Sequence, residues 1–104
     1  MSNMNQIMRQ AQAMQRKLAQ AQEELAEQEV SGSAGGGMVT AVVAGGGGEV
    51  RSITINPEAV DPDDVVMLQD MVVAAVNEAL RAAKEMEQET LGGITGGLLP
   101  PGLM

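Results

Sequence analysis

Apolar and small residues recur every three or four positions along the first part of the chain. From Met4 to Gln28 they fall at Met4, Ile7, Ala11, Met14, Leu18, Ala21 and Leu25. This is the spacing of a coiled-coil seam, kept over roughly three and a half heptads. Strong helix formers fill the positions between them, and the run contains neither glycine nor proline. The pattern therefore predicts one long amphipathic helix.

Such a helix is too long for the rest of the chain to cover. It would span nearly ~40 Å at ~1.5 Å per residue, whereas a compact domain of this size has a radius of gyration near ~13 Å. The helix must therefore overhang its own domain and leave part of its seam exposed. A second copy of the chain is the simplest source of apolar cover, so we expect an obligate homodimer.

β-Branched residues then gather in three short segments that glycine runs separate. The segments are 29–33, 38–44 and 49–56, and the glycine-rich links are 34–37 and 45–48. This arrangement is typical of three strands joined by hairpins, in which glycine supplies positive φ. In the third segment Ile53 and Ile55 share one face, which we expect to face the core. A phosphate-binding loop does not fit, because no Lys-Ser/Thr pair or helix follows the glycines.

A second long helix is predicted from about Asp63 to about Glu89. Asp61 is a candidate N-cap, and Pro62 suits the first helical position. The apolar arc of this helix exceeds half its circumference, whereas a helix on one sheet needs only a ~100° stripe. Two apolar partners are implied, its own sheet and another subunit. The candidate dimer-interface residues on the two helices are Ile7, Met14, Leu18, Leu25, Val73 and Leu80.

Together these elements predict an α+β protein. We expect a two-layer α-β-β-β-α subunit with a three-stranded antiparallel sheet, a long N-terminal helix and an intertwined homodimer. Residues 1–91 would form the single domain, and residues 92–104, rich in glycine and proline, a C-terminal tail rather than a helix. The apolar residues of that tail either dock on a neighbour or stay disordered; they are Leu98, Leu99, Leu103 and Met104.

The amino-acid composition excludes several kinds of catalysis and binding. The chain of 104 residues has no cysteine, no histidine and no aromatic residue, which removes thiolate and imidazole catalysis, disulfides and base stacking. The acidic cluster at Glu58, Asp61, Asp63 and Asp64 lacks the spacing of an EF-hand and fits a capped helix start better. We expect no enzyme activity, catalytic residue, metal site, cofactor or small-molecule substrate.

Charge and hydropathy bear on partners and location. The formal charge is −8, which opposes adhesion to DNA or anionic membranes unless the few cations are segregated. No apolar run is long enough to span a membrane, and no signal peptide precedes the first helix. These features predict a cytoplasmic protein without a membrane partner.

The cations of the first helix are segregated from its seam. Arg9 and Arg16 lie almost opposite the seam on a helical wheel, and Lys17 lies to one side. Three interpretations remain open: a solvated face, an anion-binding strip for nucleic acid, or two antiparallel copies that set basic halves against the acidic ends of their partners. The surface of long glutamine-rich helices also suits a protein-interaction scaffold or a holdase-like module.

Four stretches of the sequence carry a resemblance to a known family. They are Met8-Arg9-Gln10-Ala11-Gln12-Ala13-Met14-Gln15-Arg16-Lys17-Leu18 in the first helix, Asn56-Pro57-Glu58 after the third strand, Asp70-Met71-Val72-Val73-Ala74-Ala75-Val76-Asn77-Glu78-Ala79 in the second helix, and the ending Pro100-Pro101-Gly102. Taken in this order, they resemble the YbaB/EbfC nucleoid-associated proteins.

This resemblance implies a cytoplasmic protein of the nucleoid that binds duplex DNA as a homodimer. By analogy, Arg9, Arg16 and Lys17 would contact phosphates, with Arg81 and Lys84 as further candidates. Binding would be directed mainly to the phosphate backbone and tolerant of sequence, with a role in nucleoid organisation or gene regulation.

Overall fold

Two long helices and a small sheet make up the structure, a computed structural model that describes residues 2–95. The elements in chain order are α1 (Ser2–Glu27), β1 (Glu29–Ala34), β2 (Val39–Ala44), β3 (Val50–Ile55), the 3-10 helix η1 (Pro57–Ala59) and α2 (Val65–Thr95). The sheet is antiparallel with strand order β1-β2-β3. The predicted α-β-β-β-α subunit with its two layers is confirmed.

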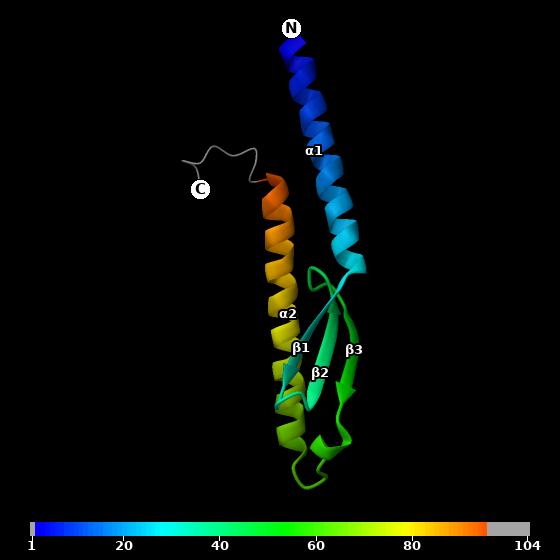
Figure 1. The fold of residues 1–104 in the computed structure, drawn as a ribbon, viewed down its shortest axis with the longest axis vertical. Helices are drawn as coiled ribbons and strands as arrows, with labels where there is room; N and C mark the ends of the chain where they lie inside the picture. Colours follow the sequence, from blue (N-terminus) through cyan, green and yellow to red (C-terminus); the bar gives the residue numbers. More distant parts are fainter. Residues whose placement is uncertain (1, 96–104) are drawn as a thin grey trace, which may run out of the picture.

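The molecule is elongated because α1 continues past the sheet. The Cα atoms of the subunit extend over 74 × 28 × 16 Å. Their radius of gyration is 19.8 Å, well above the ~13 Å of a compact domain. In Figure 1, α2 lies along one side of the sheet, and the first half of α1 extends beyond the end of α2. The predicted overhang of the first helix is confirmed.

The core lies between β2 and the middle of α2. Val39, Ala41 and Val43 alternate along β2 and are completely buried. They pack in one cluster with the fully buried alanines of α2, which are Ala75, Ala79 and Ala83. Alanine at every fourth position gives α2 a flat strip of small side chains, so the helix backbone lies close to the sheet.

Gly32 of β1 is the position at which that approach is closest. It is buried, and a β-carbon added there would overlap the backbone nitrogen of Ala79 and approach the carbonyl oxygen of Ala75 to 2.8 Å. In the two hairpin turns, glycine is needed for another reason than at Gly32, because residues 35–37 and 46–47 have positive φ. The prediction of glycine turns with positive φ is therefore confirmed at both hairpins.

β3 departs from the sequence prediction. All six of its residues are exposed, with Ile53 at 41% and Ile55 at 37% of full accessibility. The two isoleucines pair across the ladder with Ala41 and Val39 and so share the face that α2 covers elsewhere. The expectation that Ile53 and Ile55 face the core was wrong for the single subunit, because α2 covers β1 and β2 and leaves the edge strand bare.

The start of α2 also differs from the prediction. The backbone N–H of Met67 donates a hydrogen bond of 3.2 Å to the Asp64 carboxylate, so Asp64 is the N-cap. Asp61 accepts instead from the N–H of Asp63 at 2.9 Å within a tight turn before the helix. The prediction of Asp61 as N-cap was wrong, because Pro62 belongs to that turn and not to the helix.

The end of α2 lies beyond the predicted boundary. The helix continues through Gly92 and Gly93 to Thr95, so the expectation of a non-helical tail from residue 92 onward was wrong over 92–95. Each glycine costs about 1 kcal/mol of helix propensity, but lengthening a helix that has already formed avoids the larger cost of nucleation. The tail residues Leu98, Leu99, Leu103 and Met104 lie outside the described residues.

Candidate nucleic-acid interface

The seam of α1 is covered at one end and bare at the other. Ala21 and Leu25 are buried within the subunit, Met14 and Leu18 are half-buried, and Ile7 is 63% exposed. Cover decreases along the helix because the sheet and α2 reach only its C-terminal part (Figure 1). We call residues 2–17 the α1 arm, since this part projects from the body of the subunit.

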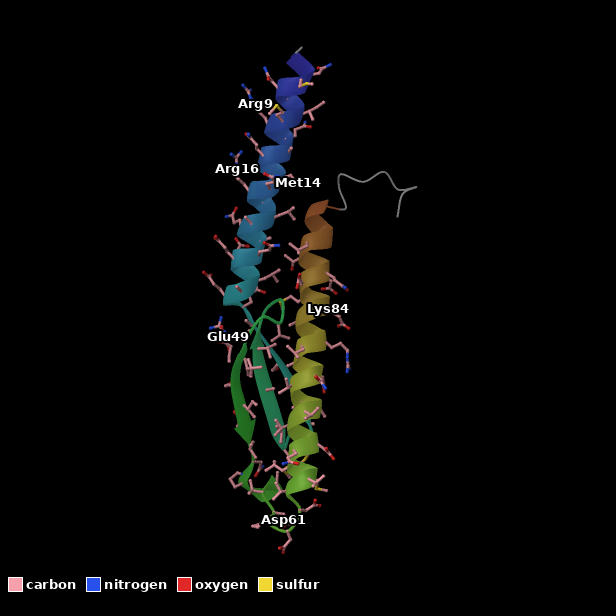
Figure 2. All side chains as sticks on the ribbon, turned by 180° about the vertical axis from the view of Figure 1, so that it is seen from behind. Arg9, Met14, Arg16, Glu49, Asp61 and Lys84 are labelled. Carbon is pink, nitrogen blue, oxygen red and sulfur yellow. The ribbon has the colours of Figure 1, made fainter. Side chains whose placement is uncertain are left out.

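The cations of the α1 arm lie on its outer side. Arg9, Arg16 and Lys17 are exposed, and Figure 2 shows Arg9 and Arg16 on the side of α1 away from α2, with Met14 on the other side. Across the described residues, none of the three has an ion-pair partner. The predicted orientation opposite the seam is confirmed for Arg9 and Arg16, and Lys17, which was predicted to lie to one side of the seam, is exposed. The charges of all three are free to meet an external anion.

Charge is strongly segregated along the chain. Residues 1–22 contain these three cations and no acidic residue, so the remainder carries all 14 acidic residues against three cations. The first acidic residue, Glu23, lies where α1 approaches the body of the subunit. A protein with a formal charge of −8 thus carries a locally positive, projecting helix. Spatial segregation of this kind is what an acidic chain needs if it is to approach a polyanion.

The two further candidate cations lie elsewhere. Arg81 and Lys84 are exposed neighbours on α2, and Figure 2 shows Lys84 pointing away from α1. Arg9 and Arg16 point to the opposite side of the molecule in the same view. The subunit therefore does not bring the five predicted DNA contacts together on one surface.

The predicted dimer-interface residues fall into two groups. Leu25 is 3% exposed and Leu80 half-buried against the core cluster, so both contact their own subunit. Ile7 and Val73, by contrast, are exposed at 63% and 58%. Met14 and Leu18 lie between these extremes, each half-buried on the seam.

Sequence reasoning missed a larger apolar surface around Val73. A β-carbon at Gly47 would lie 3.5 Å from Leu80 Cδ2, so the turn between β2 and β3 lies beside Leu80. Val73 and Val66 continue the Leu80 flank of α2 at intervals of seven residues, close to two helical turns. We call the exposed residues of this flank and of β3 the β3–α2 apolar surface; they are Val50, Ile53, Ile55, Val66 and Val73.

Metal-ligand clusters and membrane-spanning helices are both absent from the described part of the chain. Residues 2–95 contain no group of three or more acidic side chains arranged to hold a metal ion. Within the same residues, neither helix has a stretch apolar enough to cross a bilayer.

The model of the YbaB/EbfC DNA-binding family matches residues 1–98. The chain belongs to the YbaB/EbfC family. Among its relatives, a nucleoid-associated protein from Saccharopolyspora erythraea is 64% identical over 92% of this chain and 82% of its own length. A nucleoid-associated protein from Alkaliphilus metalliredigens is 54% identical over 97% of this chain and 88% of its own.

The fold of this YbaB/EbfC member also has a match among solved structures. The crystal structure of an uncharacterized protein from Helicobacter pylori superposes with a TM-score of 0.75 at 22% sequence identity. The match covers 88% of this chain and 96% of that one. It supports the α-β-β-β-α arrangement of the subunit.

Proposed function

We propose that two copies of this chain pair through the β3–α2 apolar surface and bind duplex DNA through their α1 arms. Membership of the YbaB/EbfC DNA-binding family and relatives named as nucleoid-associated proteins support a nucleoid-associated DNA-binding protein. The geometry of the subunit supports the proposed pairing, the phosphate contacts and the residues that would make them.

The observation that carries the proposal is the exposed and unpaired charge of the α1 arm. Arg9, Arg16 and Lys17 lie on a helix that projects from an otherwise acidic body and are not neutralised by described carboxylates. They precede every acidic residue along α1, the first of which is Glu23. Attraction to phosphates decays over a Debye length of about 10 Å at 0.1 M salt, so this local segregation outweighs net charge.

The composition of the chain and the arm cations support binding directed to the phosphate backbone. The chain has no aromatic residue to wedge between or stack on bases, and its arm cations are long side chains suited to phosphate oxygens. A dimer with six arm cations that neutralise about six phosphates would give a log–log salt slope near −5. We expect modest affinity and tolerance of sequence.

Pairing is supported by the amount of apolar surface that the subunit leaves bare. Three residues of β3 on the helix side of the sheet and two residues of α2 are exposed and apolar, and we infer that they act as one surface. An edge strand with exposed isoleucines, Ile53 and Ile55, is a surface that soluble proteins normally cover. A second copy covers it symmetrically and leaves both α1 arms free.

The decisive experiment compares two triple variants with the same net charge. Arg9→Gln/Arg16→Gln/Lys17→Gln removes the arm cations, and Thr54→Glu/Gln69→Glu/Gln88→Glu adds three negative charges at exposed positions of the body. In gel-shift titrations across a salt series, we expect the arm variant to lose at least tenfold in affinity and most of its salt slope. The body variant is expected to retain most of both.

Equal binding by the two variants would refute the assignment of the α1 arm. If the wild-type protein fails to retard duplex DNA even at low salt, the proposed DNA binding fails altogether. A pull-down that recovers other polypeptides under those conditions would then favour the scaffold or holdase-like alternative.

A further inference from the structure

The junction between α1 and the body is small. Of the residues of α1, Ala21 and Leu25 alone are buried among those whose side chains the structure describes. The body approaches α1 most closely at Gly45, where an added β-carbon would overlap the carbonyl group of Leu25. The N–H of Gly45 also donates a hydrogen bond of 2.8 Å to the carbonyl oxygen of Gln28. The body, including the end of α2, therefore covers only the second half of a helix of 26 residues.

Arg51 adds a contact of another kind to this junction. Its Nη2 donates a hydrogen bond of 3.0 Å to the carbonyl oxygen of Ala26, in the last turn of α1. The ladder pairs Val42 with Ser52 and Val43 with Val50, so Arg51 is the extra residue of a β-bulge. Bulges redirect side chains. At this bulge the redirected side chain is that of Arg51, which reaches the C-terminal end of α1.

The charge of Arg51 suits that position. The C-terminal end of a helix carries a partial negative charge, and a cation there is favourable. α1 has no basic residue in its own last turn, and Glu23, Glu24 and Glu27 add negative charge near its end. Arg51 thus supplies from β3 the cation that α1 itself lacks, and it satisfies a carbonyl group with no partner within the helix.

Small changes at this junction are amplified along the arm. Arg9 precedes Ala26 by 17 positions in the sequence, which is about 26 Å along a helix at ~1.5 Å per residue. A tilt of about 10° at the junction would therefore move Arg9 by roughly 4–5 Å. Successive phosphates of one DNA strand are spaced ~3.4 Å along the duplex axis. A tilt of that size is enough to change which phosphate a cation meets.

We propose that Arg51 is a positioning residue that fixes the direction of α1 and thereby the placement of the arm cations against DNA. The effect on DNA rests on the proposed function, whereas the effect on the direction of α1 does not. Arg51 acts from the body through the Ala26 carbonyl and makes no phosphate contact of its own.

The direction of α1 is measured with two labels on one chain. The chain has no cysteine, so Gln12→Cys on the arm and Asp70→Cys on the exposed face of α2 introduce unique sites for spin labels. Labelled chains are diluted in unlabelled protein, and the distance distribution is recorded with Arg51 intact, with Arg51→Gln and with Arg51→Lys. We expect Arg51→Gln to broaden or shift the distribution, and Arg51→Lys to restore part of it.

DNA binding separates positioning from direct contact. Arg51→Gln is expected to weaken binding three- to tenfold at fixed salt while the log–log salt slope stays that of the wild type, because the same phosphates are neutralised. Arg16→Gln is the matched comparison, since it removes one proposed contact from each arm and should reduce the slope by ~0.9 per contact. The thermal unfolding midpoint of each variant shows whether weaker DNA binding comes from loss of the fold or from a change in the direction of α1.

An unchanged distance distribution in Arg51→Gln would overturn the positioning role. A fall in salt slope equal to that of Arg16→Gln would also overturn it, because Arg51 would then contact phosphate itself. If wild-type protein does not bind DNA, the proposed function fails, but the distance measurement still decides whether Arg51 directs α1.

Discussion

Individual residues determine how closely the two layers of this protein approach each other. Gly32 lies directly against the backbone of Ala75 and Ala79, and no larger residue fits there without moving the helix. Gly48 lies in a turn where an added β-carbon would meet no atom within 4 Å. Gly32 is therefore constrained by packing, whereas Gly48, in the link between β2 and β3, has neither a close neighbour nor a positive φ.

Gly32→Ala is expected to destabilise the protein by roughly 1–3 kcal/mol, the usual cost of forcing extra volume into a packed core. Gly48→Ala is the matched control and should change the free energy of unfolding by less than about 0.5 kcal/mol. Both are measured by urea unfolding at one protein concentration, because the proposed pairing would make stability concentration-dependent. Equal effects at the two positions would show that the core adjusts around Gly32.

The helices differ in how their ends are stabilised. α2 begins with a local cap, in which Asp64 accepts from the N–H of Met67. α1 ends with a long-range contact, in which Arg51 of β3 donates to Ala26. A local cap can be predicted from neighbouring residues, although here the correct aspartate was three positions beyond the predicted one. A long-range cap depends on a strand 25 positions away and has no local sequence signal.

Asp64→Ala is expected to cost about 1 kcal/mol, the typical loss of an N-cap hydrogen bond. Asp63→Ala removes the same charge one residue earlier, where the side chain is exposed and accepts no hydrogen bond within the described chain. The difference between the two variants in thermal or urea unfolding isolates the cap from the general effect of charge on the helix dipole. Similar losses in both variants would argue against Asp64 as the cap.

At the scale of the whole molecule, the subunit leaves part of its apolar surface uncovered and carries a positively charged helix that projects from the body. Its sheet is covered on β1 and β2 by α2, and β3 stays bare together with Val66 and Val73. Its charge is equally uneven, with the cations of the arm separated from the acidic body. The proposed pairing and the proposed DNA binding thus use different surfaces, and we expect the two to be separable by mutation.

Ile53→Glu/Val73→Glu is expected to dissociate the dimer, because each substitution places a charge in the β3–α2 apolar surface. Met8→Glu is the control, since Met8 is also exposed, at 57%, but lies on the α1 arm. Light scattering at micromolar concentration measures the mass of each variant. A wild-type protein that is monomeric and well folded under these conditions would refute the proposed pairing.

The residue pattern determined the elements and their order. Periodicities of 3.5 and 2 and the glycine runs were enough for two helices and a three-stranded sheet, because such signals are local. The outward orientation of Arg9 and Arg16 follows from the same helical spacing. The excess of apolar surface on the second helix was also visible from its sequence.

Only the tertiary structure decided which apolar residues the subunit covers. Ile53 and Ile55 have the pattern of a core strand, but they lie at an edge that α2 does not reach. The contact of Arg51 with α1 was likewise decided by packing between distant segments. The sequence of each helix or strand determines which of its faces is apolar. Which of these faces meet depends on how the elements cross, and the crossing is set only in the folded chain.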